Sequence, residues 1–340
     1  MPTFTYPTDA RLTAIAQDFL PRLMEGRVGF DLMPLQEDDN DVLLWEQMDN
    51  FTGLQQIRGI NGAPQRVARV GIKRYRAQPG YYGEFKTVDE AELTRRRPMG
   101  IFGNQPIEIG DLVQEIALSL QVRELDLQES IIWTLLTTGT YAVANGGGTI
   151  LQTDTYPVQS YTAGTTWATA ATATPLADFR AIQLLGPAHS TEFNGNSTAY
   201  MSRITLNNLL TNINSADLYG RRVAGLATVN NAKDLNTLLL RDDLPQIEVY
   251  DKGYITDGGT FTRFLPTGKV VVMGVRPQDA KVGYYRMTRN VNEGNNGVGS
   301  YTMVQDSLAT NRPPREIVVH RGHNGGPVIF FPGAVISMSV

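Results

Sequence analysis

The longest helical pattern in the sequence runs from Ile107 to Gly139, and it restricts the fold more than any other feature. Apolar residues recur on one side at helical spacing, and charged residues occupy the other sides. The apolar side holds Ile109, Leu112, Val113, Ile116, Leu120, Leu127, Ile131 and Leu135. The charged positions are Glu108, Asp111, Glu115, Arg123, Glu124 and Glu129. About 28 helical residues would extend roughly 40 Å. We therefore predict a spine helix that crosses the whole subunit and ends at Gly139.

The stretch from Gln246 to Gly274 predicts sheet. It alternates apolar and polar residues, turns at Asp257-Gly258-Gly259, and ends in a run of valines. Its PTGK segment, residues 266–269, could be taken for a phosphate loop, but a Walker loop needs the spacing GxxxxGK[ST] followed by a helix. Asn145-Gly146-Gly147-Gly148 has no lysine either. Glycine-supplied hairpin turns explain both segments better.

The rest of the sequence predicts short helices and strands. A helix over residues 10–24 is cut short by Pro21, and residues 42–48 form a strand. A hairpin spans 141–156, and the Thr/Ala-rich tract 161–178 is a surface connection with few large side chains to bury. Helices follow near residues 201–213, 215–226 and 232–240, and two strands, 315–322 and 326–340, close the chain.

Charge is unevenly distributed, although the formal net charge is only −4. No acidic residue lies between Asp49 and Glu84, and the alternating VARVGIKRY segment within that interval predicts an extended two-stranded loop. The cations of this loop and its return are Arg58, Arg66, Arg69, Lys73, Arg74, Arg76, Arg95, Arg96 and Arg97.

Three interpretations of these cations stay open. They could neutralise nucleic-acid phosphates, with segment 58–76 as the binding surface. They could form a charged loop in water. They could also meet an acidic face on an identical neighbour, so that the protein is complementary to itself. The acidic face would consist of Glu37, Asp38, Asp39, Asp41, Glu115 and Glu124.

The sequence favours no catalytic chemistry. The chain has no cysteine, which excludes disulfides, thiolate zinc sites and cysteine nucleophiles. His320 and His323 are three apart in a glycine-rich segment, where a solvated turn is favoured over a metal site. His189 stands beside Ser190, but neighbours in sequence do not make a nucleophile–base pair. We predict no enzyme activity, no metal and no cofactor. The sequence shows no leader or membrane span, so we expect a soluble intracellular product.

Three segments resemble the lambda-type major capsid protein E family of tailed bacteriophages, which has the Hong Kong 97-like fold. QPGYYGEFKTVDEAELTRRRP, residues 78–98, resembles the return of the family's extended loop toward the spine helix. Residues 249–274 resemble its strand, exposed hairpin, FLP turn and strand. REIVVHRGHNGGPVIFFPGAVISMSV, residues 315–340, resembles its closing strands.

The resemblance implies an α+β capsid subunit in four parts. These are an N-terminal arm (1–50), an extended loop (51–103), a discontinuous peripheral domain with the spine helix (104–175 and 312–340), and an axial domain (176–311). The resemblance also implies pentamers and hexamers in an icosahedral shell that encloses double-stranded DNA without sequence-specific binding. Expected partners are a portal and, in some systems, scaffolding and decoration proteins, but no membrane. The expected location is the virion, after synthesis in the host cytoplasm. Lys73 and Lys86 could serve an isopeptide cross-link, but nothing marks an acceptor, so we predict none.

Overall fold

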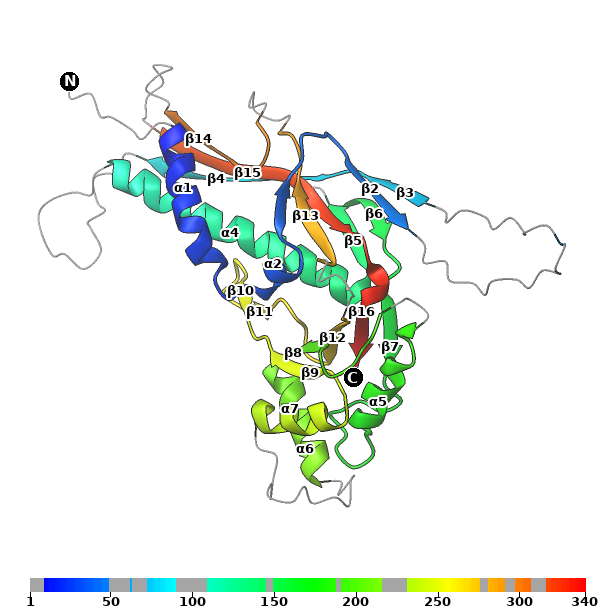
Figure 1. The fold of residues 1–340 in the computed structure, drawn as a ribbon. Helices are drawn as coiled ribbons and strands as arrows, with labels where there is room; N and C mark the ends of the chain where they lie inside the picture. The colour runs from blue at the N-terminus through cyan, green and yellow to red at the C-terminus, as the bar shows by residue number, and fades with distance from the viewer. Residues whose placement is uncertain are drawn as a thin grey trace, which may run out of the picture.

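Helix α4 (Ile109–Thr138) is 30 residues long and runs through the middle of the computed structural model (Figure 1). The structure describes residues 9–48, 62, 72–89, 109–144, 149–187, 191–215, 231–275, 281–290, 297–306 and 316–340. The predicted spine helix is confirmed, and Gly139 ends it with a φ of 69° and an N–H that donates to the Leu135 carbonyl. Helices and sheets occur together, as the α+β class requires.

A five-stranded sheet packs along one side of α4 (Figure 1). Its central strand β15 (Glu316–Ile329) pairs on one edge with β4 (Gly80–Asp89). On its other edge β15 pairs with β14 (Tyr301–Asp306) and β13 (Gly283–Met287), and β1 (Leu35–Glu37) adds to β13. Apolar side chains of α4 and β15 share a core with Leu12 and Val88. The sheet thus joins segments that lie far apart in the sequence.

The prediction of a break between residues 322 and 326 is wrong, because β15 continues straight through GHNGG. Glycine is needed in this strand because atoms of neighbouring segments lie too close for a side chain, and not because the chain turns. A Cβ added at Gly322 would lie 2.3 Å from the Tyr82 carbonyl oxygen, and one at Gly326 would lie 3.0 Å from the Tyr141 ring. After β15 a single turn of 3-10 helix (Pro332–Ala334) leads into β16 (Val335–Ser339).

A second five-stranded sheet forms the lower part of the subunit in Figure 1. Its strand order is β7 (Gln159–Thr162), β16, β12 (Lys269–Met273), β8 (Thr198–Met201) and β9 (Gln246–Val249). Helices α5 (Pro175–Gln183), α6 (Arg203–Ser215) and α7 (Ala232–Arg241) surround it and share its core. The predicted helices near 201–213 and 232–240 are confirmed, and 215–226 lies outside the described residues apart from Ser215.

The N-terminal segment lies against α4. Helix α1 (Asp9–Met24) contains Pro21 and continues past it, so the prediction that Pro21 cuts the helix short is wrong. Helix α2 (Val28–Leu32) follows, and β2 (Leu43–Met48) confirms the strand expected at 42–48. Strand β2 pairs antiparallel with β3 (Ile72–Ala77), so the two-stranded element begins at Leu43 rather than at residue 51. We call this pair the β2–β3 ribbon.

The stretch from Gln246 to Gly274 is sheet, as predicted. β10 (Gly253–Ile255) and β11 (Phe261–Arg263) form a hairpin around the Asp257-Gly258-Gly259 turn, where Gly259 has a φ of 78°. The PTGK segment is a turn that enters strand β12, and its Lys269 amine donates to the Ser339 hydroxyl at 2.7 Å. β5 (Thr140–Ala144) and β6 (Ile150–Thr155) form the predicted second hairpin.

The tract at residues 161–178 is more than a surface connection, which corrects that prediction. Trp167 is 1% exposed, and its indole N–H donates to Asp178 at 2.9 Å. Tyr161 donates to the other oxygen of the same carboxylate at 2.9 Å. Two aromatic residues and one buried carboxylate therefore fix a tract whose threonines and alanines contribute little volume.

Candidate functional site

The β2–β3 ribbon leaves the body of the subunit beside β13 and β5 (Figure 1). Its root is fixed by aromatic stacking, because the Trp45 ring lies between Tyr75 at 5.3 Å and Tyr156 at 5.5 Å. The guanidinium of Arg286 also donates to the Leu44 carbonyl at 2.7 Å. The ribbon is therefore held rigidly where it meets the sheet. A two-stranded ribbon is marginally stable alone in water.

Three of the predicted loop cations lie on the described part of the ribbon. Lys73, Arg74 and Arg76 are exposed on β3, and the Arg74 Nε lies 2.7 Å from Glu46 on β2. The other predicted cations lie outside the described residues: Arg58, Arg66, Arg69, Arg95, Arg96 and Arg97. Because side chains alternate along a strand, Arg74 and Arg76 lie on one face of β3 and Lys73 lies on the other, so both faces carry an exposed cation.

The residues of the predicted acidic face differ in exposure and in pairing. Asp38 and Asp39 form ion pairs within the subunit, with Arg286 at 3.3 Å and Arg289 at 2.7 Å. Glu37, Asp41 and Glu115 are exposed. The assignment of Glu124 to this face is wrong, because its side chain is 6% exposed and packed against β15.

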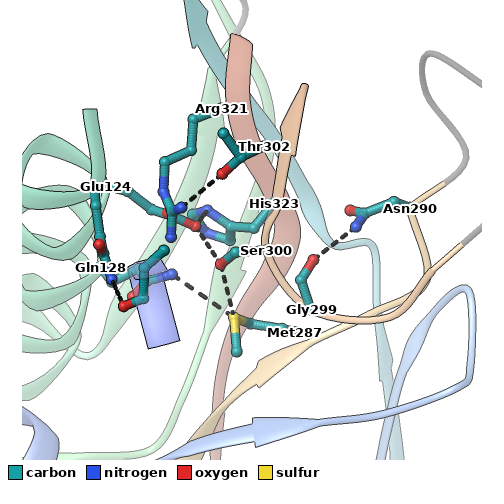
Figure 2. Close-up of polar contacts among 11 residues, drawn as sticks. Glu124, Gln128, Met287, Asn290, Gly299, Ser300, Thr302, Arg321 and His323 are labelled. Atoms are coloured by element: carbon teal, nitrogen blue, oxygen red, sulfur yellow. Dashed lines mark hydrogen bonds and ion pairs between the residues drawn. The ribbon is translucent and has the colours of Figure 1, made fainter. Parts of the chain in front are cut away.

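Glu124 is instead the centre of a buried polar cluster, which we call the Glu124 network (Figure 2). The guanidinium of Arg321 donates to one carboxylate oxygen at 2.5 Å. The hydroxyl of Ser300 donates to the other oxygen at 2.5 Å, and His323 Nδ1 lies 3.0 Å from that same oxygen. Arg321 also donates to the Thr302 hydroxyl at 2.8 Å. The network joins α4 to β15 and to the strand beside it.

The ionisation of Glu124 follows from these contacts. Burial alone would raise the pKa of its carboxyl, but the charge of Arg321 and the bonds from His323 and Ser300 lower that pKa to about 2. Glu124 is therefore an anion at neutral pH, neutralised inside the protein.

The two C-terminal histidines lie in strand β15, so the predicted solvated turn is wrong. His323 is fully buried, and its Nε2 shares a hydrogen bond of 2.9 Å with the Tyr285 hydroxyl. His320 lies on the opposite face of the sheet beside Phe85. Among the described residues no group of three or more His, Asp or Glu side chains is placed to hold a metal ion. His189 lies outside the described residues.

A second buried carboxylate, Glu129, anchors the N-terminal segment to α4. Its oxygens accept bonds from Arg27 at 3.0 Å, from the Gly29 N–H at 3.3 Å and from the Tyr250 hydroxyl. Arg27 also binds Asp126 at 2.6 Å. Glu129 thus connects the N-terminal segment and the strand end near Tyr250 to the same helix.

Sequence reasoning missed Arg321 and His323, and it placed Glu124 and Glu129 on exposed sides of α4. The helical period offered one signal, since Ile116, Leu120 and Glu124 recur four residues apart. An acidic residue on an apolar stripe requires a buried partner. Arg321 and His323 gave no such signal, because the glycines beside them are typical of a turn, whereas the segment is a strand.

Residues 38–307 match the family described as phage major capsid protein E. No curated protein is significantly similar to the chain. No helix in the described ranges is long and apolar enough to cross a membrane.

Solved structures share the fold over most of the chain. A phage-related protein from Bordetella bronchiseptica RB50 is 12% identical, with a TM-score of 0.54 over 98% of this chain and 97% of the other. The capsid subunit of a native GTA particle is 11% identical, with a TM-score of 0.52 over 92% and 90%. The capsid of Myoviridae phage XM1 is 12% identical, with a TM-score of 0.50 over 93% and 91%. These likenesses confirm the expected Hong Kong 97-like α+β fold. With the family match, they establish that this chain belongs to the phage major capsid protein E family, as a structural subunit of an icosahedral shell.

Proposed function

We propose that the chain assembles into pentamers and hexamers that together tile the closed head of a tailed phage. The observation that carries this proposal is the β2–β3 ribbon, a two-stranded element that is rigid at its root and incomplete by itself. Identical subunits joined head to tail close into rings. A ribbon that lies over the next subunit supplies such a head-to-tail contact.

The four-part division is also part of the proposal, with boundaries that follow the two sheets. The peripheral domain would contain α4 and the sheet around β15, and the axial domain would contain the second sheet with α5, α6 and α7. Because β16 pairs with β12, residues 335–339 would join the axial domain rather than the peripheral one. The extended loop would begin at β2, and β4 would belong to the peripheral sheet.

The shell would enclose double-stranded DNA without gripping it. A formal net charge of −4 supports this, since a surface that held DNA tightly would need an excess of cations. A portal, with scaffolding or decoration proteins in some systems, would complete the particle after synthesis in the host cytoplasm. The chain would have no catalytic role.

Electron microscopy of the purified protein tests the proposal. We expect closed shells whose vertices and faces show five- and six-fold clusters of subunits. Protein that stays monomeric under every assembly condition, with no shells, tubes or rings, would count decisively against it.

A further inference from the structure

The turn that leads into strand β8 contains an asparagine followed by a glycine, Asn194 and Gly195. In such a pair the backbone nitrogen of the glycine can attack the side-chain carbonyl carbon of the asparagine, because the bond between them closes a five-membered ring. Glycine favours the attack, since it has no side chain to obstruct it. The asparagine then loses its side-chain nitrogen as ammonia. The groups around the pair decide whether the folded protein hinders this deamidation or assists it.

The nitrogen that would attack already has a base beside it. The N–H of Gly195 donates to the carboxylate of Asp243 at 2.9 Å. A general base must lie within hydrogen-bond reach of the proton that it removes, about 2.6–3.2 Å between heavy atoms. An N–H lies in the plane of its peptide group, so a base that accepts this bond leaves both faces of the nitrogen open to the carbonyl carbon. Asp243 therefore lies where the reaction needs a base.

Asp243 has an uncommon backbone conformation. Its φ is 53°, and within the described part of the chain it is the one residue other than glycine with a positive φ. Its N–H donates to the Leu240 carbonyl of α7 at 3.2 Å, and its carbonyl accepts from the Gln183 side chain of α5 at 2.6 Å. Backbone outliers of this kind are frequent at functional sites. Two helices thus hold the Asp243 carboxylate against Gly195.

The side-chain amide of Asn194 is held at both of its polar atoms. Its Oδ1 accepts from the Asn196 N–H at 3.0 Å. Negative charge develops on this oxygen as the carbonyl carbon becomes tetrahedral, and a backbone N–H already in place stabilises that charge. Its Nδ2, which leaves as ammonia, donates to the Glu192 carboxylate at 2.9 Å. The oxygen that gains charge and the nitrogen that departs are both fixed.

Water has access to this turn, as hydrolysis requires, because Asn194 is half-buried and both Glu192 and Asn196 are exposed. Of the asparagine–glycine pairs that the structure describes in full, the other is Asn324 and Gly325 in β15. Asn324 is 1% exposed, and Gly325 pairs with β13 on one side and β4 on the other. The two pairs thus have the same sequence and opposite environments.

We propose that Asn194 is a self-modifying site, with Asp243 as the general base for its deamidation. Asp243 takes the proton from Gly195, the freed nitrogen forms a bond to Cγ of Asn194, and the bond from Cγ to Nδ2 breaks. The proton returns through water to the departing nitrogen, so ammonia leaves and a cyclic imide remains. One water molecule then opens the imide to aspartate or isoaspartate at position 194. The reaction needs no cofactor and no oxidant.

The product carries a new negative charge beside Glu192 and Asp243, which contact the pair before the reaction. Like charges this close repel one another. The turn before β8 should therefore loosen as the protein ages. The modification takes place within one subunit and does not depend on the proposed assembly.

Peptide mapping by mass spectrometry tests the proposal. Freshly made, intact protein is incubated at neutral pH in water enriched in oxygen-18, so that each opened imide carries the label. We expect labelled aspartate and isoaspartate at position 194 and none at position 324 of the same sample. A synthetic peptide with the sequence of residues 191–198 gives the rate without the fold, and the folded protein should exceed it. A rate in the folded protein no higher than that of the peptide overturns the proposal.

Variants of Asp243 distinguish catalysis from a structural role. Asp243→Asn and Asp243→Gly both tolerate a positive φ, and circular dichroism checks that they fold. We expect each to slow the reaction by about 100-fold, the loss typical of a general base. If Asp243 only held the turn closed, both variants would loosen it and speed the reaction. A rate that rises or stays the same overturns the proposal.

Asp242→Asn is the matched control. Asp242 is the neighbouring carboxylate, but it pairs with Arg180 at 3.1 Å. Its loss should leave the rate at Asn194 unchanged. Slowing as large as that of the Asp243 variants would show that the effect is not specific to Asp243, and would also overturn the assignment.

Discussion

Arg321 donates to the buried carboxylate of Glu124 at 2.5 Å and so fixes strand β15 against helix α4. The two residues are 197 positions apart in the sequence. Glu124 lies on the long helix α4, and Arg321 lies on the central strand of the sheet packed along that helix. This pair sets the position of the spine helix along the sheet.

Glu124→Gln should destabilise the unassembled subunit by about 3–5 kcal/mol, because it leaves the buried guanidinium of Arg321 without a counter-charge. Urea denaturation measures the free energy of unfolding. Asp18→Asn, on the exposed side of α1, is the control and should change it by less than about 0.5 kcal/mol. A loss for Glu124→Gln as small as that of the control would show that the pair is dispensable.

The stabilisation by Glu124 should depend on pH. Its pKa is about 2 in the folded subunit and about 4.3 in an unfolded chain. The contribution is therefore fully present above about pH 4.5 and is lost as the pH falls through about 2. We expect the difference in unfolding free energy between wild type and Glu124→Gln to shrink over that window. A constant difference from pH 6 to pH 2 would contradict this assignment.

Gly322→Ala should destabilise the subunit by about 1–3 kcal/mol, the usual cost of overpacking. The new Cβ would meet the Tyr82 carbonyl oxygen at 2.3 Å in the paired strand. Gly164→Ala is the matched control, since nothing lies within 4 Å of its Cβ position. Thermal melting of both variants checks the prediction, and equal melting temperatures would refute it.

Trp45→Ala should lower the free energy of unfolding by about 3–5 kcal/mol, as the loss of a large buried aromatic residue usually does. It removes the ring that Tyr75 and Tyr156 stack against, so the root of the ribbon should loosen. Hydrogen exchange should rise in β2 and β3, while Leu44→Ala, which alters a 45% exposed neighbour, should leave it nearly unchanged. Unchanged exchange in Trp45→Ala would mean that the stack does not hold the ribbon.

Reversing the charges of Lys73, Arg74 and Arg76 to Glu should leave the subunit folded but prevent shell assembly. Exposed ion pairs contribute only ~0.2 to 1 kcal/mol each, yet every subunit in a particle repeats the contact. Circular dichroism checks the fold, and electron microscopy checks assembly. The same reversal at Arg22, Lys233 and Arg241 is the control. Normal shells from the ribbon variant would disprove its role in assembly.

Local patterns predicted those elements whose stability is decided locally. The helical period located α4, and the turn at Asp257-Gly258-Gly259 located the β10–β11 hairpin. Each needs only a few neighbouring residues to be specified.

The misassigned residues depend on distant partners. Gly322, Gly325 and Gly326 indicate a turn in the sequence. The atoms that leave no room for a side chain at these positions belong to Tyr82, Arg286 and Tyr141, which are far away in sequence. The sequence pattern placed Glu124 on an exposed side of the helix because its buried partner, Arg321, lies 197 residues further along the chain.

In the part of the chain that the structure describes, each of the three apolar cores contains side chains from β15 or β16: Ile317 and Val319 in one, Val328, Ile329 and Val335 in another, Ile336 and Met338 in the third. The ribosome makes these two strands after every other described element. Each core therefore lacks some of its side chains on a nascent chain until these strands emerge from the exit tunnel. The packing of all three cores is thus finished late in synthesis, after the helices that line them have been made.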